Sequence, residues 1–205
     1  MWLKICGITD LAAVEAALAA RVDAIGFVFS PSVRRVEPAQ AAQLAARARA
    51  RVALIAVTTH PPQPLIDEIL RVFQPDMLQT DAEDFAGLRL PQALLRLPVL
   101  RAEAAAGNAL PRRILFEGAR GGSGEAADWD AAARLARRCE LILAGGLNAH
   151  NVAAAVRAVR PYGVDVSSGV ESAPGRKCAQ KIAEFARAAS AAFQGMNEEM
   201  TDDAS

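Results

Sequence analysis

The chain has 205 residues, which is enough for one domain with a large hydrophobic core or for a barrel that counts as one domain. Its 23 basic residues balance its 23 acidic residues, so no overall charge favours binding to nucleic acid or to an anionic membrane surface. No apolar run is long enough to cross a bilayer, the first residues lack a secretory pattern, and the three cysteines follow no zinc or disulfide spacing. We therefore expect a cytoplasmic protein that binds no metal, membrane or nucleic acid.

Apolar, strand-like segments alternate with helical segments along the chain. The expected strands cover residues 2–6, 24–29, 52–57, 77–79, 99–101, 113–117, 141–144 and 163–166. The expected helices cover residues 11–20, 38–50, 64–73, 82–95, 128–138, 149–159 and 176–192, and the segment 102–110 is the one weak helical unit.

Eight strand and helix units with continuous apolar strands are typical of a closed parallel barrel covered by helices. The sequence therefore predicts an α/β protein with a single (β/α)8 (TIM) barrel over residues 1–193. An open doubly wound sheet is the alternative, but the first turn lacks the GxGxxG fingerprint. The polar residues 194–205 predict a disordered C-terminal tail.

Cys6 ends the first expected strand, directly before a glycine and the start of the first expected helix. In barrels and doubly wound sheets, catalytic side chains gather at the carboxyl ends of strands because the following loops build the active face. Free cysteine is also among the most buried residue types, so a structural role as a small apolar residue is the alternative. Position alone makes Cys6 a candidate reactive group.

Two glycine-bearing loops follow the seventh and eighth expected strands. The first contains Gly145 and Gly146, and the second contains Ser167, Ser168 and Gly169. Glycine lets backbone amides approach an anion closely, and serine hydroxyls add further donors. Because these two loops frequently hold a phosphate in eight-stranded barrels, the pair predicts a phosphate site rather than two ordinary tight turns.

Several sequence blocks, in order along the chain, resemble the phosphoribosylanthranilate isomerase family. The blocks are KICGIT at 4–9, GFVF at 26–29 with SVRR at 32–35, GGSG at 121–124 with DW at 128–129, AGGLN at 144–148, and VDVSSGVE at 164–171 with PG at 174–175. The resemblance implies a cofactor-independent Amadori rearrangement of N-(5-phosphoribosyl)anthranilate to 1-(2-carboxyphenylamino)-1-deoxyribulose 5-phosphate in tryptophan biosynthesis. The implied partner is a phosphosugar substrate, and the chain is expected to be a monomer or a homodimer.

The resemblance also implies an acid and a base for this reaction. Cys6 matches the general base, and a thiolate there requires a lowered pKa, which Lys4 or a cationic intermediate could provide. The role of Lys4 is open between such an electrostatic effect and a structural ion pair. Glu117 stands where the family usually has an aspartate, so our hypothesis is that Glu117 is the general acid, with a pKa raised in the closed site. The alternative is that Glu117 only caps its loop and Asp128 or Glu125 supplies the proton.

Two further residues are candidates for substrate binding. The resemblance aligns Arg35 with the arginine that contacts the anthranilate carboxylate in the family, and a planar guanidinium suits a planar carboxylate. The adjacent Arg34 is the alternative for this role. Asp165 precedes the second phosphate loop and is a candidate either for hydrogen bonds to sugar hydroxyls or for a structural role.

The chain also departs from the family pattern near the fourth strand. Asp81 occupies the place of a histidine, His60 is interpreted as a loop residue, and Arg101 resembles a basic position near the site. Three other functions compete: a phosphate-binding barrel of another pathway, a bifunctional sugar isomerase, and a degenerate barrel that only binds a phosphosugar. The first would not carry KICGIT, and the second would need a phosphate loop in each half.

Overall fold

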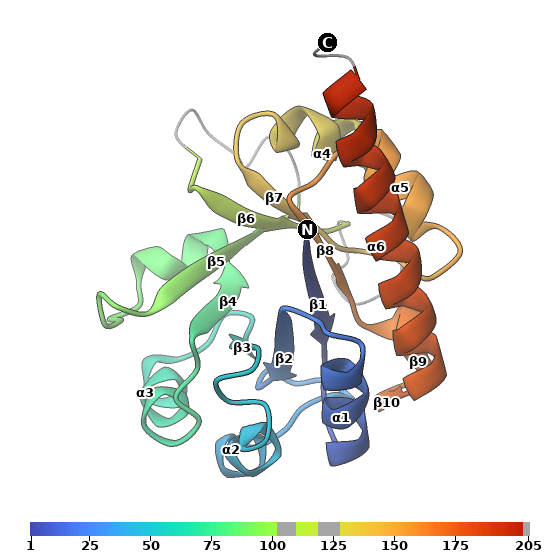
Figure 1. Cartoon of the computed structure of the whole chain (residues 1–205). Coiled ribbons are helices and arrows are strands. Elements are labelled where there is room, and N and C mark those ends of the chain that lie inside the picture. The colour runs from blue at the N-terminus through green and yellow to red at the C-terminus, as the bar shows by residue number, and fades with distance from the viewer. Residues whose placement is uncertain (102–109, 119–127, 203–205) are drawn as a thin grey trace.

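The structure is a computed structural model that describes residues 1–101, 110–118 and 128–202. Eight parallel strands close into one barrel in chain order, with helices outside the ring of strands (Figure 1). The barrel strands are β1 (Trp2–Cys6), β2 (Ala24–Val28), β3 (Ala53–Val57), β4 (Met77–Asp81), β5 (Leu95–Leu100), β6 (Arg113–Phe116), β7 (Glu140–Leu143) and β8 (Gly163–Val166). The predicted (β/α)8 barrel is confirmed.

Helices connect most of the strands, and a small hairpin follows the last one. The helical elements are α1 (Leu11–Ala19), α2 (Pro38–Ala45), α3 (Gln63–Val72), η1 (Ala82–Ala86), α4 (Trp129–Ala136), α5 (Val152–Val159), η3 (Ser168–Val170) and α6 (Ala179–Asp202). The hairpin pairs β9 (Glu171–Ala173) with β10 (Arg176–Lys177). Along 1–101, 110–118 and 128–202, no helix is both long and apolar enough to cross a membrane.

Side chains alternate between two apolar layers along each strand. In β1, Leu3 and Ile5 pack into the layer between strands and helices, whereas Trp2 belongs to the cluster inside the barrel. Successive strand side chains point to opposite faces, so Lys4 and Cys6 share the inner side with Trp2. This alternation places a charged amine and a thiol inside the barrel.

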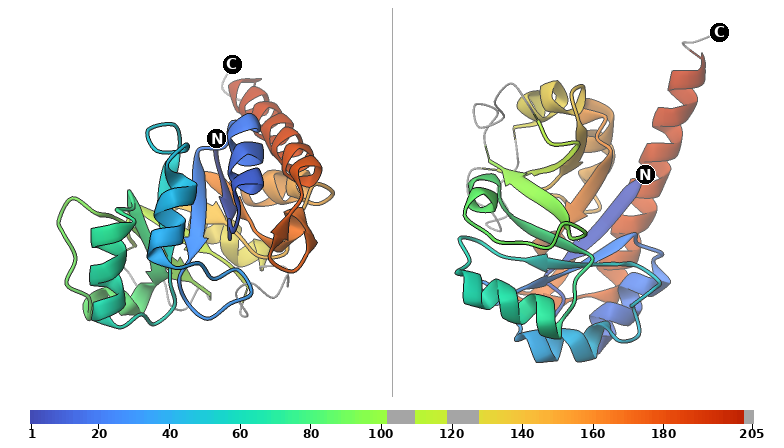
Figure 2. Two further views of the ribbon diagram at one scale, coloured as in Figure 1. Left: turned by 90° about the horizontal axis from the view of Figure 1, so that it is seen from below. Right: turned by 90° about the vertical axis from the view of Figure 1, so that its left-hand side faces the viewer.

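The boundaries of several elements differ from expectation. The helix expected over 82–95 is only the short η1, which Gly87 ends, and β5 already begins at Leu95. The helix expected from residue 176 begins at Ala179, because the two preceding residues form β10. Residues 194–202, expected to be disordered, continue α6, which extends beyond the barrel (Figure 2). Met196 packs against the hydrophobic core, which gives this last part of the helix a tertiary contact.

Candidate active site

A cavity of about 300 Å³ opens at the carboxyl ends of the strands. Each of the eight strands, or the loop that follows it, contributes at least one lining residue. Among them are Cys6, Arg34, Gln79, Glu117 and Asp165. A volume of this size is within the range of small-molecule sites, and its place on the barrel is where such enzymes hold their active sites.

Cys6 lies at the carboxyl end of β1, and its side chain has room because the neighbouring residue on β2 is a glycine. Cys6 pairs in register with Gly26, and a Cβ atom at Gly26 would lie 3.2 Å from the Cys6 Sγ atom and 3.0 Å from Cε of Lys4. Burial raises the pKa of the Cys6 thiol, against the lowering influence of Lys4. The direction is the opposite of the lowered pKa that we expected, because removal of a thiolate from water outweighs one nearby cation.

Lys4 is fully buried and forms an ion pair inside the barrel. Its Nζ atom lies 2.9 Å from Oδ1 of Asp165 on β8. Burial lowers the pKa of Lys4, but Asp165 and Cys6 outweigh that effect, so the pKa lies above its usual value. The two interpretations of Lys4 are thus compatible, because the same ammonium group pairs with a carboxylate and acts on the thiol.

Glu117 follows β6 and reaches the cavity from the side of β4 to β6. Its carboxylate contacts Nη1 of Arg101, whose Nη2 lies 2.7 Å from Oδ1 of Asp81. Burial raises the pKa of Glu117, against the lowering influence of Arg101, which is the direction expected of a general acid. Of the alternative acids, Asp128 accepts hydrogen bonds as the N-cap of α4, and Glu125 lies outside the described residues.

The structure places Arg34, not Arg35, at the cavity. Arg35 pairs with Glu37 at 3.0 Å, and its side chain is 48% exposed. Arg34 lines the cavity and donates two hydrogen bonds to Glu171, at 2.7 and 2.9 Å. Arg35 as the carboxylate contact stays a prediction, and its position outside the cavity lining makes Arg34 the stronger candidate. Two adjacent arginines in a loop give no sequence signal for which one points into the cavity.

The two predicted phosphate loops meet at the cavity rim. Gly145 and Gly146 have positive φ angles of 90° and 65°, and both line the cavity with Ser167 and Ser168. Gly169 does not line it, but a Cβ atom there would lie 1.9 Å from a carbonyl oxygen of the first loop. Gly169 thus allows the two loops to touch, which brings their backbones to one rim.

Three functional candidates escaped sequence reasoning. Lys177 on β10 donates to the carbonyl oxygen and the Oγ atom of Ser167, at 3.0 and 3.2 Å, and lies 2.7 Å from Glu171. Hydrogen bonds from Arg34 and Lys177 outweigh burial and lower the pKa of Glu171 to about 2. Gln79 lines the cavity, and its Oε1 atom is buried without a hydrogen-bond partner among the described residues. The short hairpin after β8, with its Pro-Gly turn, was the available signal for the first two.

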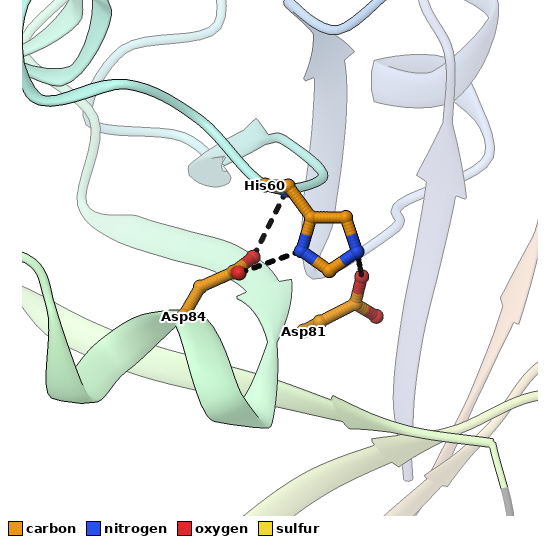
Figure 3. Close-up of side chains that lie close together, drawn as sticks. All are labelled: His60, Asp81 and Asp84. Carbon is orange, nitrogen blue, oxygen red and sulfur yellow. Dashed lines mark hydrogen bonds and ion pairs between the residues drawn. The ribbon is translucent and has the colours of Figure 1, made fainter.

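His60 lies between the carboxylates of Asp81 and Asp84 (Figure 3). Its Nδ1 atom is 2.8 Å from Asp84 and its Nε2 atom is 3.7 Å from Asp81. These three side chains are close enough to surround a metal ion, but Asp84 also accepts from Thr80 and Asp81 pairs with Arg101. The hydrogen bond to Asp84 also raises the pKa of His60. The group is therefore described as an ion-pair cluster.

A closed (β/α)8 barrel with a thiol and a carboxyl group around one cavity, beside two glycine-bearing loops, is the arrangement typical of a barrel enzyme. Residues 3–188 match the family model of N-(5'phosphoribosyl)anthranilate (PRA) isomerase. The N-(5'-phosphoribosyl)anthranilate isomerase of Nitrobacter winogradskyi is 40% identical over an alignment that covers 96% of this chain and 96% of that protein. The chain therefore belongs to the PRA isomerase family, as its motifs predicted.

Solved structures agree with this assignment. The crystal structure of phosphoribosyl anthranilate isomerase from Thermus thermophilus has a TM-score of 0.80 and 29% identity, covering 93% of this chain and 99% of that one. A phosphoribosyl anthranilate isomerase in complex with reduced 1-(o-carboxyphenylamino)-1-deoxyribulose 5-phosphate has a TM-score of 0.76 and 28% identity, with the same two coverages.

Proposed function

We propose that this chain converts N-(5-phosphoribosyl)anthranilate to 1-(2-carboxyphenylamino)-1-deoxyribulose 5-phosphate, with Glu117 as general acid and Cys6 as general base. The observation that carries the proposal is that both groups line one cavity, whose rim holds the two glycine-bearing loops. The competing function is a degenerate barrel that binds a phosphosugar without reaction, and the thiol and the carboxyl group at one cavity favour the enzyme.

The acid acts first. The Glu117 carboxyl proton moves to the ring oxygen of the substrate, the bond from C1 to that oxygen breaks, and the lone pair of the anilino nitrogen forms the iminium. Cys6 then takes the proton from C2, and the C–H electron pair becomes the C1–C2 double bond as the iminium electrons return to nitrogen. The resulting enolamine becomes the ketone when the C2 hydroxyl loses its proton and C1 takes one up. Exchange with water removes the proton from Cys6 and returns one to Glu117, so atoms and charges balance and no cofactor takes part.

The raised pKa of the Cys6 thiol is compatible with this order of events. The iminium places a positive charge beside Cys6 only after the ring has opened, and a nearby positive charge favours the thiolate. Lys4 adds a second, permanent positive charge on the same side. The base therefore becomes effective at the step that needs it.

Binding of the substrate's two anionic groups follows from the lining residues. Glu171 occupies Nε and Nη2 of Arg34 and fixes the guanidinium plane, so the remaining Nη1 is our candidate contact for the anthranilate carboxylate. The backbones of Gly145 and Gly146, with Ser167 and Ser168, are the candidate phosphate site, for which Gly169 provides close packing of the loops. Asp165 and Gln79 are candidates for the sugar hydroxyls.

The test is the loss of substrate fluorescence when freshly made phosphoribosylanthranilate is added. We expect turnover by the wild type and a loss of about 10²- to 10⁴-fold in kcat for Glu117→Gln, with nearly unchanged affinity for a reduced product analogue. Glu15→Gln, on an exposed pair with Arg47, is the matched control. Persistent activity of Glu117→Gln contradicts the assigned acid, and no turnover by concentrated wild type supports the binding barrel.

The remaining expectations concern the cell and the assembly. A cytoplasmic location and a monomeric or homodimeric state stay predictions, and size-exclusion chromatography with light scattering measures the second.

A further inference from the structure

A row of three charged side chains crosses the carboxyl ends of β4, β5 and β6. Asp81 ends β4, Arg101 directly follows β5, and Glu117 directly follows β6. One guanidinium nitrogen of Arg101 lies 2.7 Å from Asp81 and another contacts Glu117. Because neighbouring parallel strands bring their ends together, the arginine stands between the two carboxyl groups.

The three side chains are partly withdrawn from water. The exposed fractions are 12% for Asp81, 16% for Glu117 and 31% for Arg101. Interactions between charges are stronger there than in bulk water, so the sum of charge in the row decides which group ionises. With Asp81 present, a neutral Glu117 leaves a balanced pair, and without Asp81 only an ionised Glu117 would balance Arg101.

We propose that Asp81 is a positioning residue for the acid: it holds Arg101 in place and supplies its counter-charge, so that Glu117 can keep the proton that it must donate. Arg101 in turn fixes where the Glu117 carboxyl group lies in the cavity. The inference rests on the proposed function, and it concerns a residue that touches Glu117 only through Arg101.

Three other charged or titratable groups lie near this row of side chains. Lys4 and Asp165 face Glu117 from β1 and β8, but they form an ion pair of their own at 2.9 Å. His60 faces Asp81 from the loop after β3 at 3.7 Å, and its side chain is 62% exposed. Arg101 is thus the one group, among those that the structure describes, that forms ion pairs with both carboxylates of the row.

Two variants should shift the Glu117 pKa in opposite directions. Asp81→Asn leaves Arg101 with Glu117 alone, which lowers the pKa of Glu117. Arg101→Met removes the cation, which raises it. In the Arg101→Met background, Asp81→Asn should have a smaller effect on the Glu117 pKa, since only the direct repulsion between the two carboxyl groups remains. The measurement is the pH titration of the Glu117 side-chain carboxyl carbon by NMR of 13C-labelled protein, with Glu117→Gln to assign the signal.

Kinetics give a second readout. Only the fraction of enzyme that keeps the proton on Glu117 can protonate the ring oxygen of the substrate, and burial of Glu117 favours that form. That fraction falls about tenfold for each unit by which the Glu117 pKa falls. Asp81→Asn should therefore lower kcat/KM at neutral pH by about tenfold, and Asp81→Glu, which restores the charge, should recover part of it. Asp84→Asn is the matched control, because Asp84 contacts Thr80 and His60.

The proposal is overturned if Asp81→Asn leaves the pKa of Glu117 unchanged or raises it. It is also overturned if Asp81→Asn changes that pKa by the same amount in the wild type and in the Arg101→Met background. The NMR readout does not depend on turnover, so it remains decisive even if the wild type fails to isomerise phosphoribosylanthranilate. Wild-type turnover with an indifferent Asp81→Asn variant refutes only the role of Asp81. Thermal unfolding of each variant shows whether an effect on rate reflects loss of fold.

Discussion

The two sides of the barrel mouth hold their reactive groups by different means. On the base side, formed by β1 and β8, Cys6 is buried beside the ion pair between Lys4 and Asp165, and all three side chains arise within strands. On the acid side, formed by β4 to β6, Glu117 and Arg101 lie just beyond their strands and are held by ion pairs. The base side is thus placed by strand alternation and close packing, and the acid side by charge.

This difference teaches where each side is sensitive. A base held by packing responds to changes of volume, because well-packed interiors have little space to relax. An acid held by ion pairs responds to changes of charge at a neighbour that never touches the substrate. A substitution of a neighbouring residue that preserves its shape but removes its charge should therefore affect the acid more than the base.

The largest effect is expected at the base. Cys6→Ser keeps nearly the same shape but replaces the thiol with a hydroxyl group that does not ionise near neutral pH, so kcat should fall by about 10³-fold or more. The fluorescence assay for phosphoribosylanthranilate measures the change. Cys139→Ser is the matched control, because Cys139 is a free, half-buried cysteine outside the cavity lining. Equal losses in both variants would show that thiol packing, not base chemistry, explains the result.

A smaller effect is expected where the base side meets the substrate carboxylate. Arg34→Gln removes the cavity guanidinium, and loss of hydrogen bonds to a charged group should raise KM roughly 10- to 100-fold. The exposed Arg35→Gln variant should leave KM unchanged, since Arg35 pairs with Glu37 outside the cavity. Arg34→Lys should recover little, because lysine lacks the planar fork that fits Glu171. If Arg35→Gln raised KM and Arg34→Gln did not, Arg35 would be the contact for the substrate carboxylate, as the sequence predicted.

The sequence predicted the base side better than the acid side. Strand periodicity and the glycine-bearing loops placed Cys6 and Ser168 correctly at the mouth, because a strand fixes the direction of each side chain. Arg34 was weighed but not chosen, since residues in a loop follow no fixed alternation. The pairing of Arg101 with both Asp81 and Glu117 depends on contacts between three strand ends, which no spacing along the chain encodes.

The direction of the Cys6 pKa was also beyond sequence reasoning. A nearby lysine suggested a lowered pKa, but the cost of burying a thiolate depends on how completely the barrel excludes water. In contrast, the raised pKa of Glu117 was expected, because a site closed by eight strands favours the neutral carboxyl group.

The smallest effect is expected at His60, which marks the outer limit of the acid side. His60 pairs with Asp84 at 2.8 Å and lies 3.7 Å from Asp81, but its side chain is 62% exposed. Exposed ion pairs contribute little, so His60→Gln should change kcat/KM by no more than about threefold and leave the Glu117 titration unchanged.

The stability of the same variant gives the matching pH dependence. The hydrogen bond to Asp84 raises the pKa of His60 above its value in the unfolded chain. The contribution of His60 to the free energy of unfolding is therefore fully present below the unfolded pKa. It is lost as the pH rises through the folded pKa, and there the free energies of unfolding of wild type and His60→Gln should converge. Urea unfolding across this pH range measures the difference.

The Glu117 titration in His60→Gln tests how far the acid side extends. If the pKa of Glu117 moved as far in His60→Gln as in Asp81→Asn, the acid side would include the loop after β3. The exposed imidazolium of His60 would then share the negative charge of Asp81 with Arg101.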